Sequence, residues 1–294
     1  AEEGKVKAMV IMGENPMVSD PDIQHVAEAL EKLEFLVVID IFPNETTRYA
    51  DVILPAASFA EKDGTFTSTE RRVQRIRAAL RPPGEARPDW EILCELSMRL
   101  GYPMSYRHPA EIMDEIASLV PIYGGISYER LEGEGLQWPC PSPDHPGTPF
   151  LHKDRFPRGK GRFHPVEYRD PDEYPDEEYP LILTTGRVLY HFHSRTMTGR
   201  VEGLQGLSPE AYVEVNPLDA GRYGIEDGAR VRVSSRRGSI EVLAKVTTRV
   251  PQGTVFIPFH FGEQAANRLT NPALDPISKI PEYKVCAVKL EPLG

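Results

Sequence analysis

Residues 184–200, TTGRVLYHFHSRTMTGR, concentrate cationic and hydroxyl side chains in a chain whose formal net charge is -10. Thr185, Gly186 and Arg187 follow an apolar run, and His191 and His193 come soon after. A guanidinium group pairs with a phosphate through two parallel hydrogen bonds. We therefore expect this stretch to bind an anionic group, such as a phosphate or a pterin-type ligand.

A metal site is the weaker interpretation of the same histidines. His191 and His193 lie two positions apart, which places them on one face of a strand, but no third ligand is evident nearby. A lone histidine is also more often structural than functional. We assign no catalytic residue and no metal ligand to this chain.

A second polar cluster lies between the first expected strand, residues 7–12, and a helix expected over residues 21–34. It contains Gly13, Glu14, Asn15 and Ser19. Ligands bind at the carboxyl ends of strands in open α/β sheets, beside helix N-termini. An ordinary turn between strand and helix would use the same residue types, so this cluster alone leaves both interpretations open.

Several other residues are ambiguous on their own. Asp40 ends a buried-type strand, where a dinucleotide-binding fold places its ribose-binding carboxylate, although a solvated strand end fits equally well. Asp89 begins an amphipathic helix, where an acidic residue usually acts as an N-cap. Residues 61–72 suit either a polar ligand-binding loop or a solvated hairpin. No GxGxxG pattern occurs, so a nicotinamide cofactor is not expected.

Composition excludes some classes of protein. The acidic net charge argues against a broad nucleic-acid surface. The longest apolar runs fall far short of the roughly 20 residues that a membrane span needs, so we expect no membrane insertion. The three cysteines are isolated, which predicts a reducing, cytoplasmic location and no disulfide framework. They are also too few for an iron–sulfur cluster held by this chain alone.

Hydrophobic periodicity predicts two different architectures along the chain. Apolar runs at residues 7–12, 35–41 and 51–55 alternate with helical patterns, which is typical of a parallel sheet covered by helices. Residues 121–180 are rich in proline and predict a long surface connection. Six short strands follow between residues 180 and 294, separated by turn signals, and they predict a small closed barrel.

Longer blocks resemble a known family. GENP, IDIFPNETTRYADVILPAASFAEKDGTFTSTERRVQ and PDWEILCELSMRLGYPM resemble the later part of the molybdopterin oxidoreductase fold. TTGRVLYHFHSRTMTGR, VEVNPLDAGRYGIEDGARVRVSSRRGSIEVLAKVT and ANRLTNPALDPISKIPEYKVCAVKLEP resemble the molybdopterin dinucleotide-binding domain of the same enzymes. The resemblance covers nearly the whole chain. HFHSRTMTGR and IPEYKVCAV are most similar to catalytic subunits of formate dehydrogenases, followed by assimilatory or periplasmic nitrate reductases.

The resemblance implies an α/β fold followed by a mainly β fold. Residues 1–120 would form part of a doubly wound α/β domain, residues 121–178 a Pro-rich connection, and residues 179–294 a six-stranded β-barrel of the double-psi type.

The resemblance also implies the cofactor bis-molybdopterin guanine dinucleotide, with molybdenum or tungsten. Carried over position by position, the expected cofactor-binding residues are Gly13, Glu14, Asn15, Ser19, Asp40, Asp89, Thr185, Gly186, Arg187, His191, His193, Ser194, Asn267, Tyr283 and Lys284. Among them, Asp89 corresponds to the carboxylate that recognises guanine.

The chain also departs from the family pattern. It has neither the cysteine-rich segment for the iron–sulfur cluster nor the cysteine or selenocysteine metal ligand. We therefore expect a C-terminal portion that is inactive alone and needs an N-terminal catalytic segment or subunit carrying the cluster, with electron-transfer subunits as further partners and formate as the substrate. A nitrate reductase-type portion, or a non-catalytic subunit that binds or stores the guanine dinucleotide, is the alternative.

Overall fold

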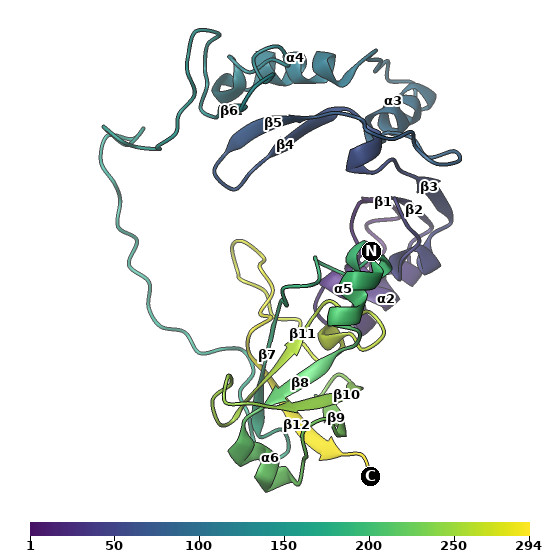
Figure 1. The fold of residues 1–294 in the computed structure, drawn as a ribbon, viewed down its shortest axis with the longest axis vertical. Helices are drawn as coiled ribbons and strands as arrows, with labels where there is room; N and C mark the ends of the chain where they lie inside the picture. The colour runs from purple at the N-terminus through teal and green to yellow at the C-terminus, as the bar shows by residue number, and fades with distance from the viewer. The chain divides into compact units, whose positions relative to one another are not determined.

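The computed structural model describes all 294 residues and divides into two compact units. Unit 1 contains residues 1–53 and 168–294, and unit 2 contains residues 54–167. The sequence predicts domain boundaries near residues 120 and 178. These boundaries refer to the domains of the family and not to compact units, and they stay a prediction. Figure 1 labels the elements of both units.

Unit 1 begins with a small α/β layer. Strands β1 (Ala8–Met12) and β2 (Phe35–Asp40) pair in parallel, and β3 (Val52–Pro55) completes the sheet. Helices α1 (Pro16–Ser19) and α2 (Ile23–Glu31) connect β1 to β2, and the 3-10 turn η1 (Thr46–Tyr49) precedes β3. Strand, helix and parallel strand therefore follow one another as the periodicity predicts.

One local expectation here is wrong. The sequence suggests that Asp20 and Pro21 begin the helix, but α2 begins at Ile23, after Asp22 in a left-handed conformation with φ 48°. Asp20 instead ends α1, and its backbone N–H donates to the carbonyl of Pro16. The Asp20 carboxylate accepts from the Ser19 hydroxyl at 3.0 Å.

The C-terminal part of unit 1 is a closed barrel, as the sequence predicts. Its strands are β7 (Leu181–Gly186), β8 (Tyr212–Val215), β9 (Arg230–Ser234), β10 (Ser239–Val246), β11 (Thr254–Pro258) and β12 (Cys286–Pro292), paired in the order β10-β8-β11-β7-β12-β9. Along β9 and β10 buried and exposed side chains alternate. The buried side chains of all six strands, including Leu183 of β7, Val213 of β8 and Val233 of β9, fill the interior of the barrel.

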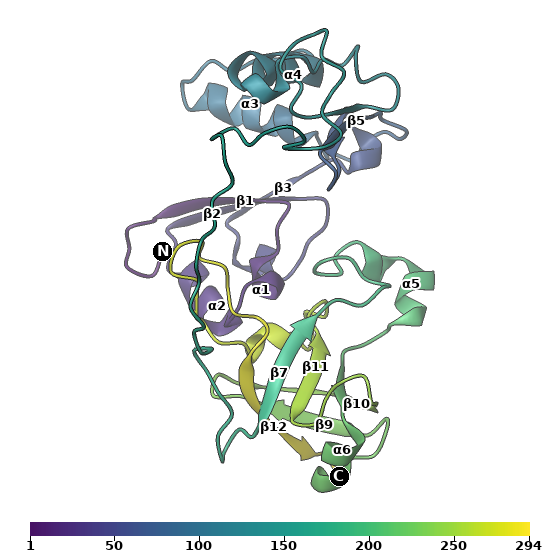
Figure 2. The ribbon, with the colours of Figure 1, turned by 90° about the vertical axis from the view of Figure 1, so that its left-hand side faces the viewer.

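Short helices lie in the connections between the barrel strands, as Figure 2 shows for α5 and α6. They are η4 (Thr198–Arg200), α5 (Glu202–Leu207), α6 (Pro217–Tyr223) and η5 (Ala266–Arg268). The Asn216 side chain caps α6 by accepting from the N–H of Leu218 at 3.0 Å, and Gly224 ends the helix with φ 66°. Both ends of α6 match the sequence signals.

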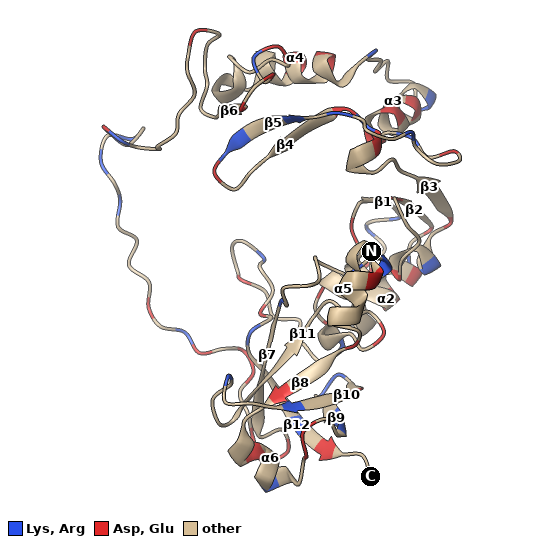
Figure 3. Ribbon diagram, in the orientation of Figure 1, with Lys and Arg blue, Asp and Glu red and all other residues tan.

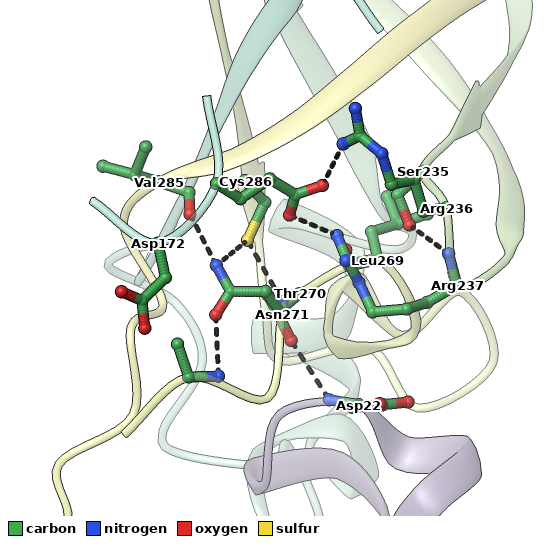
Figure 4. Close-up of polar contacts among 12 residues, drawn as sticks. Asp22, Asp172, Ser235, Arg236, Arg237, Leu269, Thr270, Asn271, Val285 and Cys286 are labelled. Atoms are coloured by element: carbon green, nitrogen blue, oxygen red, sulfur yellow. Dashed lines mark hydrogen bonds and ion pairs between the residues drawn. The ribbon is translucent and has the colours of Figure 1, made fainter. Parts of the chain in front are cut away.

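The segment that leads into β7 is held on the barrel by ion pairs. Glu173 contacts Arg236 and lies 2.7 Å from a guanidinium nitrogen of Arg237. Arg237 also donates to the carbonyl of Leu269 at 2.9 and 3.0 Å. Close by, the Asn271 backbone N–H and side-chain amide both point at the buried thiol of Cys286 (Figure 4).

Unit 2 is built on an antiparallel sheet of β4 (Gly64–Thr67), β5 (Arg72–Ile76) and β6 (Leu136–Gln137), together with η2 (Phe59–Glu61), α3 (Asp89–Arg99), α4 (Pro109–Leu119) and η3 (Pro121–Tyr123). Of the two interpretations of residues 61–72, the structure shows the hairpin. The sequence predicts that residues 121–180 form a surface connection, but the first part of this segment belongs to the core of unit 2. Ile126, Leu131 and Cys140 are buried against Val73 and Met113.

None of the helices is both long enough and apolar enough to cross a membrane.

Candidate functional site

A cleft of about 700 Å³ opens in unit 1, where the carboxyl end of β7 meets the end of α1. It is lined by Glu14, Ser19, Asp20, Thr185, Gly186, Arg187, His193, Phe259, Asn267, Tyr283 and Lys284. Every lining residue except Asp20 and Phe259 belongs to the set expected from the sequence. These positions come from four separate stretches of the chain, and the fold brings them together.

The end of β7 forms one wall of the cleft. Gly186 pairs with Pro258 in the parallel register of β7 and β11. A Cβ atom at Gly186 would meet the Phe256 ring at 2.6 Å, so any larger residue would have to displace that ring. The Thr185 hydroxyl donates to the carbonyl of Tyr283 at 2.9 Å, which ties the strand end to the loop before β12.

Two side chains on the loop after β7 make no ion pair, although the Asp20 carboxylate interacts electrostatically with His193. The Arg187 guanidinium makes no hydrogen bond or ion pair within the chain and lies over the Phe259 ring, 5.7 Å from its centre. The His193 ring contacts the same Phe259 edge-to-face at 6.0 Å, and its nitrogens are unpaired. The cleft therefore presents a free guanidinium and a free imidazole on one aromatic support.

Lys284 and Tyr283, from the loop before β12, also line the cleft. The Lys284 ammonium donates to the carbonyl of Thr185, which places a second fixed positive charge near the same strand end. The Tyr283 hydroxyl donates to the carbonyl of Ser19 at 2.8 Å. Burial, with the Asp20 and Glu14 carboxylates nearby, raises the pKa of Tyr283 to about 12. The tyrosine therefore stays a hydrogen-bond donor at neutral pH.

Asn267 joins the α/β layer to the barrel. Its side chain is almost fully buried, and its amide donates to the carbonyls of Val18 and Ser19 at 2.8 and 3.1 Å. Through these bonds the end of α1 is fixed beside the barrel strands. Burial raises the pKa of the Asp20 carboxyl, although the Ser19 hydroxyl partly offsets that effect.

Five of the expected residues lie in unit 1 but do not line this cleft, and His191 is one of them. Gly13 turns the chain after β1 with φ 63°. The buried Asn15 amide donates to Glu45 at 2.7 Å. Asp40 accepts from the N–H of Ile41 and the amide of Asn44. Ser194 lines a separate hollow of about 120 Å³. Their assignment to the cofactor stays a prediction.

Asp89 lies in unit 2. It is the first residue of α3, after Pro88, and its carboxylate pairs with Lys62. The side chain is therefore engaged in an ion pair rather than in a capping bond, and its role in recognising guanine stays a prediction.

His191 has a different environment from His193. It is buried, with one ring nitrogen 3.1 Å from the Thr198 hydroxyl and the other 2.7 Å from the carbonyl of Ser208. Both nitrogens are thus used within the protein, and the residue holds the loop after β7. Its assignment as a cofactor contact stays a prediction.

Two lining residues, Asp20 and Phe259, lie outside the set expected from the sequence. No local pattern marks either residue, because each reaches the cleft only through the pairing of β11 with β7 and the short turn after α1.

Two known domain families match this chain. The profile "Molybdopterin oxidoreductase" matches residues 1–99, and the profile "Molydopterin dinucleotide binding domain" matches residues 181–287. The chain belongs to the molybdopterin oxidoreductases. The two matches together cover more than half of it, and the second contains most of the residues that line the cleft.

Several curated molybdopterin oxidoreductases are similar over nearly the whole chain. The "F420-dependent formate dehydrogenase 2 subunit alpha" of Methanococcus maripaludis is 53% identical, over 98% of this chain and 43% of its own length. "Formate dehydrogenase H" of Escherichia coli is 40% identical, over 100% and 42%. The "Assimilatory nitrate reductase catalytic subunit" of Bacillus subtilis is 42% identical, over 99% and 43%. The chain thus spans less than half the length of these relatives.

A solved structure supports the fold. "Acetylene Hydratase from Pelobacter acetylenicus" matches with a TM-score of 0.73 and 18% identity, over 97% of this chain and 44% of its own. At that identity the likeness concerns architecture alone.

The residues present fit the dinucleotide that the family binds. A cleft of about 700 Å³ lies within the range of roughly 300–1,000 Å³ that is usual for ligand sites. Its unpaired guanidinium and its ammonium suit a diphosphate, and its hydroxyl, amide and imidazole groups suit the polar edges of a pterin or nucleoside. Thr185, Gly186, Arg187, His193 and Lys284 would hold the anionic part.

Proposed function

We propose that this chain is the cofactor-binding C-terminal portion of a formate dehydrogenase-like enzyme. The parent reaction would oxidise formate to carbon dioxide, releasing one proton and two electrons. The cofactor would be bis-molybdopterin guanine dinucleotide, which supplies a molybdenum or tungsten centre for the two-electron step. The observation that carries the proposal is the cleft itself, where nine residues expected from the family pattern meet.

The residues of the cleft would bind and orient one dinucleotide. The guanidinium of Arg187 and the ammonium of Lys284 would neutralise the diphosphate, and Tyr283, still protonated at neutral pH, would support the Ser19 carbonyl at the rim. Positive charge beside a pterin favours its more negative, reduced form, which is an electrostatic effect on its potential. The chain thus contributes binding and charge, while the metal ligand and the iron–sulfur cluster would come from an N-terminal segment or partner subunit.

The similarity to formate dehydrogenase alpha subunits supports formate over other substrates, since the identity reaches 53% with an archaeal member. Electron-transfer subunits would take up the two electrons. The three free thiols, two of them buried, support a reducing location such as the cytoplasm.

A nitrate reductase-type enzyme is the second candidate, because an assimilatory nitrate reductase is 42% identical over nearly the whole chain. The two candidates share the cofactor and differ in the oxoanion, so substrate assays separate them. A non-catalytic subunit that stores the dinucleotide is the third candidate, and it predicts cofactor on this chain without the cysteine-rich segment.

The test uses the complete protein that contains this chain. Metal analysis, release of guanine nucleotide by acid, and formate-dependent dye reduction are measured on one preparation, with nitrate reduction in parallel. We expect molybdenum or tungsten, guanine nucleotide and formate oxidation together. Nitrate reduction without formate oxidation would favour the second candidate, and absence of guanine nucleotide from active protein would overturn the proposal. Residues 1–294 alone should not oxidise formate.

A further inference from the structure

His260 lies behind the cleft rather than in it. It follows β11, and none of its surface is exposed. The preceding residue, Phe259, donates its N–H to the carbonyl of Gly186 at 3.1 Å, which extends the pairing of β11 with β7 by one step. This pairing delivers the His260 ring to the loop that carries Arg187 and His193.

The two ring nitrogens of His260 contact that loop at two points. The N–H of Val188 donates to Nε2 at 2.9 Å, and Nδ1 lies 2.5 Å from the carbonyl oxygen of His193. A backbone N–H can only donate and a carbonyl can only accept. Nε2 is therefore unprotonated and Nδ1 carries the hydrogen, so the contacts fix one neutral tautomer.

The loop needs such support because its backbone is in an uncommon conformation. His193 has φ 48° and Arg195 has φ 62°, in the left-handed region that residues with a side chain seldom occupy. Such conformations persist only where the surroundings hold them. The His260 contacts bracket the loop between Val188, next to Arg187, and His193.

We propose that His260 is a positioning residue for the nucleotide, because its single neutral tautomer clamps the loop that aims Arg187 and His193 into the cleft. This inference rests on one part of the proposed function, namely that the cleft binds the guanine dinucleotide. His260 contacts lining residues but does not itself line the cleft, so it would contact no ligand atom.

The electrostatic surroundings of His260 support the neutral form. Burial lowers the pKa of His260, while the hydrogen bond to the His193 carbonyl works in the opposite direction. The positive charges that face it, on Arg187 and on His191 and His193 when protonated, lower it further. The ring also lies beside the aromatic Phe259 and Phe261, with ring centres 4.7 and 6.5 Å away.

The test compares two substitutions in the complete protein, with guanine nucleotide per protein as the readout. His260→Phe keeps a ring but loses both hydrogen bonds. We expect nucleotide affinity to fall about tenfold, which corresponds to the net contribution of one to two buried hydrogen bonds. His260→Gln can donate and accept at once, and we expect it to restore affinity to within about threefold of the wild type. Equal affinity of wild type and His260→Phe would overturn the proposal.

A matched control separates positioning from general destabilisation. Asp219, also buried in unit 1, accepts from the N–H of Gly253 at 2.7 Å but lies in α6. Asp219→Ala should lower stability and leave nucleotide affinity unchanged. If Asp219→Ala lowered affinity as much as His260→Phe, the effect would be one of folding, and the inference would fail.

Acidification provides a test that does not depend on the folding of His260→Phe. Because the folded state holds His260 neutral, the clamp is complete at neutral pH and is lost as pH falls through its lowered pKa. Nucleotide retention by the wild type should therefore fall more steeply with acid than retention by His260→Gln, which keeps every other titrating group. Parallel acid profiles would overturn the proposal.

Failure of the proposed function would look different. If the cleft did not bind the dinucleotide, Arg187→Ala would leave nucleotide content unchanged. If the cleft binds it but His260 does not position the loop, Arg187→Ala would lower the content while His260→Phe would not.

Discussion

Cationic side chains have different surroundings in the two compact units. In unit 2 several of them pair with carboxylates: Arg75 and Arg77 with Glu132, and Arg87 with Glu95. Arg71 and Arg130, also in unit 2, donate to backbone carbonyls instead. Figure 3 shows basic residues along β5 and acidic ones on α3. In the cleft of unit 1, Arg187 has only an aromatic ring beside it. Paired surface charges contribute little and are screened by solvent, whereas an unpaired guanidinium at a strand end is available for a ligand.

The contrast is local and does not describe the whole of unit 1. Away from the cleft, Arg236 and Arg237 both pair with Glu173, which is largely buried. Within one unit, therefore, some arginines stabilise the fold, while Arg187 lines the cleft without an acidic partner. Substitutions at Glu173, Arg187, Asp20 and Arg87 test this separation of roles.

The largest expected effect is on stability, at Glu173. Glu173→Gln leaves two partly buried guanidinium groups without their shared carboxylate, and breaking such a pair typically costs about 3 kcal/mol. We expect urea unfolding of the complete protein to show that loss. Guanine nucleotide content measured under folding conditions should not change. A loss of nucleotide with unchanged stability would contradict the separation of roles.

The next effect is on binding, at Arg187. If Arg187 binds the diphosphate as proposed, Arg187→Ala would remove a charge-assisted hydrogen bond worth about 1.5–3 kcal/mol. We expect a roughly ten- to hundredfold fall in nucleotide affinity and little change in the midpoint of unfolding, because the side chain has no hydrogen bond or ion pair within the protein. Arg187→Lys keeps the positive charge but loses the planar guanidinium, so its nucleotide affinity should lie between those of the wild type and Arg187→Ala. Destabilisation without loss of nucleotide would reverse the comparison.

A smaller effect, dependent on pH, is expected at Asp20. Because burial raises the pKa of this carboxyl, folding favours its protonated form. That contribution is complete below the pKa of the unfolded state and is lost as pH rises through the raised value. Asp20→Asn should therefore be more stable than the wild type at neutral pH. The difference should vanish in acid, which unfolding curves at several pH values would show.

The sequence predicted the barrel well because its signals are local. Period-2 alternation, as in Arg230–Ser234, and the Asn216 cap depend only on neighbouring residues, and both agree with the structure. The parallel pair of β1 and β2 also follows from a short strand–helix–strand pattern.

The parts that could not be predicted depend on long-range pairing. Cys140 and Leu131 are buried in unit 2, although proline-rich composition suggested a surface connection. Proline restricts the backbone but does not prevent packing, so composition alone could not reveal this core. Likewise, nothing near His260 in the sequence shows that its ring meets Val188, because that contact exists only once β11 has paired with β7.

The smallest expected effect is at Arg87, in the paired group of unit 2. Its guanidinium lies 2.5 Å from Glu95 and 3.7 Å from Glu91, and the side chain is about half exposed. Exposed pairs of this kind gain little, because water and salt screen them and two long side chains lose freedom. Arg87→Ala should leave both the unfolding midpoint and the nucleotide content close to wild type. Arg187→Ala, measured in the same assays, provides the contrast: if the two substitutions lowered nucleotide content equally, the absence of an acidic partner would not be what makes an arginine available to the ligand.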